Sequence, residues 1–118
     1  MAFDAGLADR VRIILARLGP FSERKMFGGL CFLVNGNMCC GIMKNDLMLR
    51  LTPDAAAQAL KQPHTRPMDF TGKPIPSMLY IAPAGLDSDH DLEAWVHTAV
   101  KLARARPPKP EKTQTPRR

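Results

Sequence analysis

The chain has 118 residues, 45% of them hydrophobic and 24% charged, which is the composition of one folded domain with a packed core. No apolar run is long enough to cross a membrane, and the N-terminal stretch MAFDAGLADR lacks the basic and apolar regions of an export signal. Three cysteines, an odd number, then predict a cytoplasmic protein whose thiols stay free.

The formal net charge of +6 is concentrated at the C-terminal end. From Arg104 onward there are six bases and one acid, so residues 1–103 carry a net charge of only +1. We therefore predict a nearly neutral domain over residues 1–104 and a disordered, proline-rich basic tail over residues 105–118. The bases of this tail, which can contact nucleic-acid phosphates weakly and without reading sequence, are Arg104, Arg106, Lys109, Lys112, Arg117 and Arg118.

The first predicted elements are a helix over residues 7–18, whose apolar residues share one side, and a β-hairpin. Asn35-Gly36 between apolar runs is the strongest hairpin signal, because both turn positions need positive φ. A regular two-residue turn places Leu33 opposite Met38, Phe32 opposite Cys39 and Cys31 opposite Cys40. Residues 47–51 add a third strand.

Further along the chain, Thr52-Pro53 predicts the start of a short helix, since a hydroxyl cap is followed by proline at the first position. Residues 66–70 and 77–82 predict two short strands, which their prolines place toward a sheet edge. Ser88 caps a final amphipathic helix. The predicted fold is α+β: a helix, a three-stranded antiparallel meander, a short helix, two strands and a helix, with one mainly antiparallel sheet in a single domain.

The cysteines allow two interpretations. Cys31 and Cys40, facing each other across the hairpin, can form a redox-sensitive pair, or they can be small thiols packed as hydrophobes in a reducing cell. Cys39 and Cys40 are adjacent on a strand and are expected on opposite faces, so they cannot grip one metal ion. We expect no metal site. The seven methionines likewise fit either a dimer surface or core filling.

Motifs for catalysis are weak. Gly28-Gly29 leads into a strand and no Lys-Ser/Thr follows, so the pair predicts a close backbone crossing or a bulge and not a phosphate loop. The histidines His64, His90 and His97 fall in a loop, at a helix start and on a helix, and no nucleophile has a recognisable partner. We expect a protein that is not an enzyme and holds no cofactor.

Four stretches together, RKMFGG, VNGNM, LMLRL and RPMDFTGKP, resemble the TfoX N-terminal domain family, over about Leu7 to Arg104. The resemblance implies an α+β fold with a central antiparallel sheet and carries no catalytic role. The residues that match the marked motifs of the family are Lys25, Met26, Phe27, Gly28, Gly29, Arg66, Pro67, Met68 and Asp69.

For function, the resemblance implies a relation to the TfoX/Sxy regulators of bacterial competence genes, which act with the cyclic-AMP receptor protein. In those regulators a helical second domain follows, and here residues 105–118 stand in its place. Our first hypothesis is a non-catalytic, regulatory protein-interaction module, monomeric or homodimeric, that binds a protein such as a transcription regulator through a sheet edge or residues 66–74. The alternatives are a weak nucleic-acid binder through the basic tail, and a small redox-sensitive or metal-binding protein using Cys31 and Cys40.

Overall fold

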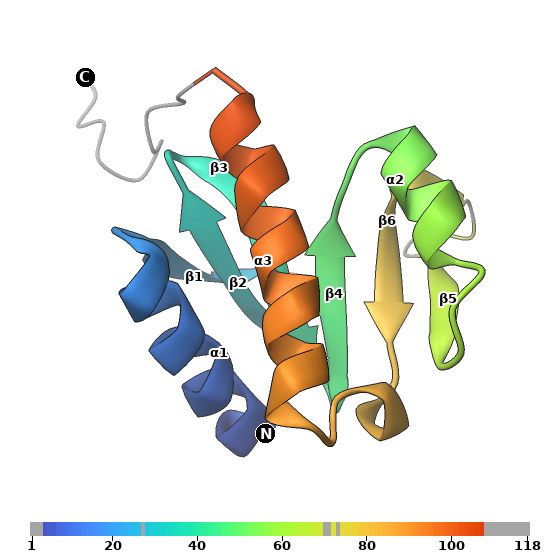
Figure 1. Ribbon diagram of the computed structural model, residues 1–118, viewed down its shortest axis with the longest axis horizontal. Coiled ribbons are helices and arrows are strands. Elements are labelled where there is room, and N and C mark those ends of the chain that lie inside the picture. Colours follow the sequence, from blue (N-terminus) through green and yellow to red (C-terminus); the bar gives the residue numbers. More distant parts are fainter. Residues whose placement is uncertain (1–3, 27, 70–71, 73, 108–118) are drawn as a thin grey trace.

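Helices cover one face of an antiparallel sheet (Figure 1). The computed structural model describes residues 4–26, 28–69, 72 and 74–107. Its helices are α1 (Ala5–Leu18), α2 (Pro53–Ala59) and α3 (Asp89–Ala105), with a short 3-10 turn η1 (Pro83–Gly85). Its strands are β1 (Ser22–Met26), β2 (Gly29–Val34), β3 (Asn37–Met43), β4 (Asp46–Arg50), β5 (Thr65–Asp69) and β6 (Pro74–Ile81).

The described strands form one sheet in the order β1-β2-β3-β4-β6-β5, and every neighbouring pair is antiparallel. The predicted α+β class is confirmed. The sequence analysis missed β1, so the expected three-stranded meander has a fourth strand. Ser22–Met26 reads SERKM and lies at an edge with its residues alternately half-buried and exposed, so it lacks the apolar pattern of an inner strand.

The predicted helix starts are confirmed by their capping bonds. The Ala55 amide donates to Thr52 Oγ1 at 3.1 Å, and the Asp91 amide donates to Ser88 Oγ at 3.0 Å. The predicted place of the prolines is also confirmed, because β5 is an edge strand and β6 pairs with β4 only from Met78 onward. None of the described helices has the length and apolar character needed to span a membrane.

The hairpin turn forms as expected, but its register shifts. Asn35 and Gly36 have φ of 56° and 77°, and Leu33 pairs with Met38. A bulge then inserts Cys39, so Phe32 pairs with Cys40 and Cys31 pairs with Gly41. The expected opposition of Cys31 and Cys40 is therefore wrong.

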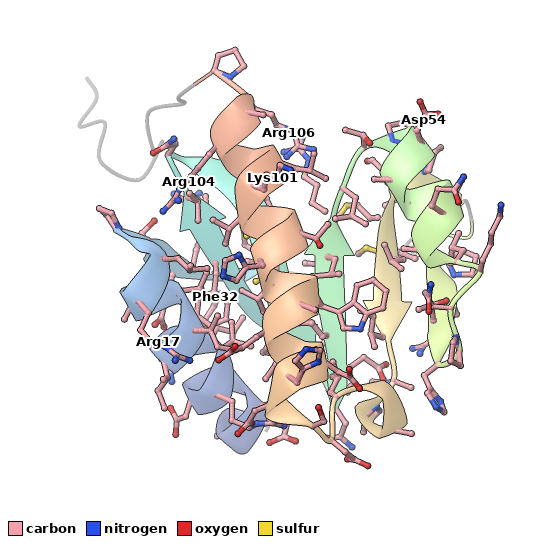
Figure 2. All side chains as sticks on the ribbon, viewed as in Figure 1. Arg17, Phe32, Asp54, Lys101, Arg104 and Arg106 are labelled. Carbon is pink, nitrogen blue, oxygen red and sulfur yellow. The ribbon has the colours of Figure 1, made fainter. Side chains whose placement is uncertain are left out.

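The main core lies between the sheet and the helices. Figure 2 shows Phe32 of β2 between α1 and α3, and the Phe21 ring meets it edge-on at 6.0 Å between centroids. Because of the bulge, Cys39 and Cys40 are both buried in this core, although adjacent strand residues normally face opposite ways. Cys31 is buried on the other face of the sheet.

Candidate functional site

Methionines gather on the face of the sheet that lies opposite the helices. Six of the seven in the chain form one cluster there, and the seventh, Met1, lies outside the described residues. We call this surface the methionine face; its residues are Met26, Met38, Met43, Met48, Met68, Met78, Cys31, Ile75 and Tyr80. It results from strand alternation, since the partners of these residues in the ladders, such as Met48 and Tyr80, point the same way.

Some residues of the methionine face are buried and others are accessible. Met48 and Met68 are 0% and 1% exposed, whereas Met26, Met38 and Met43 are only partly buried. Methionine is unbranched and polarisable, so a surface built from it adapts its shape to what it touches. Such surfaces are typical of protein-binding sites.

Gly29, a residue of the first family motif, is where two strands approach each other closely. A Cβ atom on it would lie 2.3 Å from the Ile42 carbonyl oxygen and 2.7 Å from Met43 Sδ. The predicted close backbone crossing is confirmed, because only glycine leaves room here for the neighbouring strand and for a methionine of this face. Gly28 has φ of 75° and forms the turn before it.

Arg66, from the second motif, forms a small cluster at the β5 side of the methionine face. Its guanidinium donates to Asp46 Oδ2 at 2.6 Å and lies 4.7 Å from the centre of the Tyr80 ring. Burial raises the pKa of the Tyr80 phenol. Sequence reasoning missed Asp46 and Tyr80 as contacts of Arg66, because only the pairing of β4, β6 and β5 brings these residues together.

The motif residues do not meet at one point. Met26 and Met68 lie on the methionine face, but at β1 and β5, the two edges of the sheet. Lys25 pairs with Leu30 and Pro67 pairs with Leu79, so both point toward the helix side. The backbone of Asp69 pairs with Pro74, and Phe27 lies outside the described residues.

The three arginines of helix α1 are neutralised by neighbouring acids. Each is paired with a carboxylate: Arg10 with Asp89 at 3.0 Å, Arg12 with Glu23 at 2.6 Å and Arg17 with Glu93 at 2.7 Å. Arg50 pairs with Met78 in the β4–β6 ladder and so belongs to the opposite face of the sheet. This arrangement does not favour nucleic-acid binding by the folded domain.

Two of the six bases assigned to the tail belong to the folded domain instead. Helix α3 continues to Ala105, and Arg104 and Arg106 near its end donate to the Leu18 and Leu51 carbonyls (Figure 2). Burial lowers the pKa of Arg106. Helix α3 therefore extends one residue past the domain boundary expected at residue 104. Lys109, Lys112, Arg117 and Arg118 lie outside the described residues.

The three thiols are buried and have no disulfide partner among the described residues. Burial raises the pKa of Cys31 to about 11, and a hydrogen bond with Cys39 together with burial raises that of Cys40. Both are therefore neutral thiols at physiological pH, which makes them weak nucleophiles. Within the described part of the chain, no group of three or more His, Cys, Asp or Glu residues is placed to hold a metal ion.

The sequence profile of the TfoX N-terminal domain matches residues 14–103. The chain belongs to the TfoX N-terminal domain family. The match includes all six described strands and therefore the whole methionine face. Comparison with curated proteins and with solved structures gave no significant match.

Proposed function

We propose that this TfoX N-terminal domain is a non-catalytic, regulatory module that binds a partner protein through the methionine face. The observation that carries the proposal is the gathering of six methionines on a sheet face that none of the described helices covers. The partly buried methionines of this face, Met26, Met38 and Met43, remain open to another surface, and methionine side chains tolerate the repacking that binding requires.

The charges around the methionine face define what the partner offers. Arg24 pairs with Cys31 and Arg50 with Met78, so both bases share this face with Arg66. Asp46, an acid on the same face, is already paired with Arg66. We infer a partner that presents apolar side chains flanked by carboxylates, because such a surface complements the partly buried methionines and the bases. A second copy of the same face would bring like charges together.

The regulatory part of the proposal rests on the family. TfoX, which gives the family its name, is associated with bacterial competence, and a transcription regulator with an acidic, apolar surface would fit the methionine face. That the domain works by binding and not by catalysis is supported by its buried, neutral thiols.

A comparison of surface variants tests the proposal. The full chain is immobilised and exposed to lysate of its source organism, as wild type, as the double variant Met26→Lys/Met38→Lys, and as Ile13→Lys. Ile13 is 61% exposed on α1, so its variant adds a lysine on the helix side as a control. We expect wild type and Ile13→Lys to retain the same proteins and the double variant to lose them. Equal retention by all three, or none by wild type, would contradict the proposal; circular dichroism verifies that each variant folds.

A further inference from the structure

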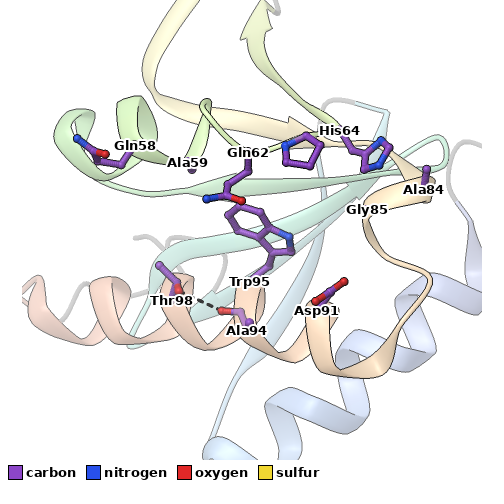
Figure 3. Close-up of a pocket in the computed structure, with 11 residues that line it drawn as sticks. Gln58, Ala59, Gln62, His64, Ala84, Gly85, Asp91, Ala94, Trp95 and Thr98 are labelled. Atoms are coloured by element: carbon purple, nitrogen blue, oxygen red, sulfur yellow. Dashed lines mark hydrogen bonds between the residues drawn. The ribbon is translucent and has the colours of Figure 1, made fainter.

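A pocket of about 610 Å³ opens between α2, η1 and α3, on the opposite side of the sheet from the methionine face (Figure 3). One wall carries Gln58, Gln62 and His64, and the other carries Asp91 and Thr98 of α3. The volume lies in the range of sites that bind small organic molecules or a single large side chain. The role proposed for the methionine face does not involve this pocket.

Trp95 provides a flat aromatic surface inside the pocket. Figure 3 shows its indole rising from α3 toward Gln62, between the two walls. The side chain is partly buried and packs against the helix-side core, so the ring is held in place. An indole in such a position attracts planar groups by stacking and cations by their interaction with the ring face.

The polar groups around Trp95 are available to a ligand. Among the described residues, the side chains of Gln58, Gln62 and His64 have no hydrogen-bond or ionic partner. Within the described part of the chain, the one ion-pair partner of the Asp91 carboxylate is the neighbouring His90, at 3.6 Å, and the carboxylate is exposed. None of the described residues that line the pocket is a lysine or an arginine. The pocket therefore combines a carboxylate and amide oxygens with no permanent positive charge.

His64 is held in an unusual conformation at one end of the pocket. Its φ of 67° lies in the left-handed region of backbone conformations, which residues other than glycine rarely adopt. Its carbonyl accepts a hydrogen bond from the Ala82 amide at 2.8 Å, and a Cβ on Gly85 would lie 3.0 Å from the Cβ of His64. The residues around η1 thus pack against His64 and fix the end wall. Strained residues of this kind are concentrated at binding sites.

We propose that this pocket binds a planar organic cation of the guanidinium type, stacked on Trp95 and paired with Asp91. A guanidinium group is flat, always charged and weakly hydrated, and its N–H donors lie in the plane of the group. It can therefore stack on the indole while it donates to the carboxylate and to the glutamine oxygens. Anionic ligands are disfavoured because they would meet Asp91 without a compensating base. The source is either a free guanidine compound or an arginine side chain of a peptide.

The fluorescence of Trp95 reports directly on binding, because it is the single tryptophan of the chain. The full chain is titrated with N-acetylarginine amide and with N-acetylcitrulline amide, which has nearly the same shape but no charge. We expect a saturable change in emission with the arginine compound and none with the citrulline compound. Because Arg117 and Arg118 could themselves supply a guanidinium group, the titration is repeated on the full chain with both changed to Gln. Tighter binding by that variant would show that the protein's own arginines occupy the same pocket.

Asp91→Asn tests the assigned ion pair, and Asp54→Asn is its matched control. Both acids lie in the first turn of a helix, but only Asp91 lines the pocket. We expect binding of the arginine compound to be roughly ten-fold weaker in Asp91→Asn and unchanged in Asp54→Asn. The proposal would be overturned if the citrulline compound bound as tightly as the arginine compound, or if Asp91→Asn bound the arginine compound as tightly as wild type does. It would also be overturned if neither wild type nor the variant with Arg117 and Arg118 changed to Gln gave a saturable change in emission. If a peptide with the sequence of residues 108–118 binds more tightly than N-acetylarginine amide, the natural source is a peptide. If the two bind equally, the source is a free guanidine compound.

Discussion

Phe32 pairs with Cys40 across the β2–β3 hairpin, one residue beyond the partner that a regular two-residue turn gives it. The inserted residue is Cys39, and the shift turns Cys31 and Cys40 to opposite faces of the sheet. The backbone of the sheet therefore separates two thiols that the hairpin sequence places side by side. This removes the geometric basis for a redox pair across the hairpin.

We first predict that Cys31 and Cys40 do not form a disulfide in the folded protein. The variant Cys39→Ala leaves only these two thiols, so they can be counted after mild oxidation of the native protein followed by denaturation. We expect two free thiols per chain, because a disulfide requires Cβ atoms about 3.8 Å apart on the same side of the ladder. A loss of both thiols would mean that the bulge is absent in solution.

We next predict that the Cys31 thiol makes stability fall in alkaline solution. Burial raises its pKa from the ordinary 9.0 to about 11, so the folded state favours the protonated thiol. Above pH 9 the unfolded chain loses this proton while the folded chain keeps it, and the free energy of unfolding decreases by up to about 1.4 kcal/mol per pH unit until pH 11. Urea unfolding across this range should show a smaller decrease for Cys31→Ala. Identical slopes in both proteins would contradict the expectation.

The two motif glycines should differ in their response to alanine. Gly29→Ala places a Cβ atom 2.3 Å from a backbone oxygen of the next strand, so we expect a loss of roughly 2–3 kcal/mol in the free energy of unfolding. Gly28→Ala meets no atom within 4 Å but must adopt φ of 75°, which costs about 1 kcal/mol. Thermal or urea unfolding gives the order, and a larger loss for Gly28→Ala would refute the assigned strand approach.

Asn37 is expected to stabilise the end of α3. It is the one buried polar residue among those described, and its Nδ2 donates to the Pro107 carbonyl at 3.0 Å and to that of Ala103 at 3.4 Å. Asn37→Ala leaves these oxygens without this donor, which costs about 1–3 kcal/mol. The same change at exposed Asn45 should alter the free energy of unfolding by less than about 0.5 kcal/mol. Equal losses would show that the contact to α3 contributes nothing.

Any binding to nucleic acid should depend on the C-terminal bases and not on α1. Arg12 and Arg17 are already paired with Glu23 and Glu93, so changing both to Gln should leave the affinity of the full chain for duplex DNA unchanged. Binding should weaken when Lys109, Lys112, Arg117 and Arg118 are changed to Gln, and it should depend less on salt. The slope of log affinity against log salt concentration should become shallower by about 0.9 for each phosphate contact that is lost. Fluorescence anisotropy at two salt concentrations measures both. Weaker binding of duplex DNA by the α1 variant would show that the folded domain also contacts DNA.

Part of the methionine face coincides with residues that the family motifs mark. The sequence identified Met26, Gly29, Arg66 and Met68 as motif residues, and the structure places all four on the face of the sheet opposite the helices. It did not predict Asp46 and Tyr80 as the contacts of Arg66, since these are 20 and 14 residues away along the chain. It also gave no sign of the pocket around Trp95, whose walls come from segments on either side of β5 and β6.

The sequence by itself determined the features that depend on neighbouring residues: the caps at Thr52 and Ser88, the turn at Asn35-Gly36, the amphipathic helices and the α+β order. These are decided within a few residues, because backbone angles and short-range hydrogen bonds act locally. Only the tertiary structure decided the bulge at Cys39, the addition of β1 and the methionine face. Each depends on which strands become neighbours and in what register, and that choice is set by the packing of distant segments into one core.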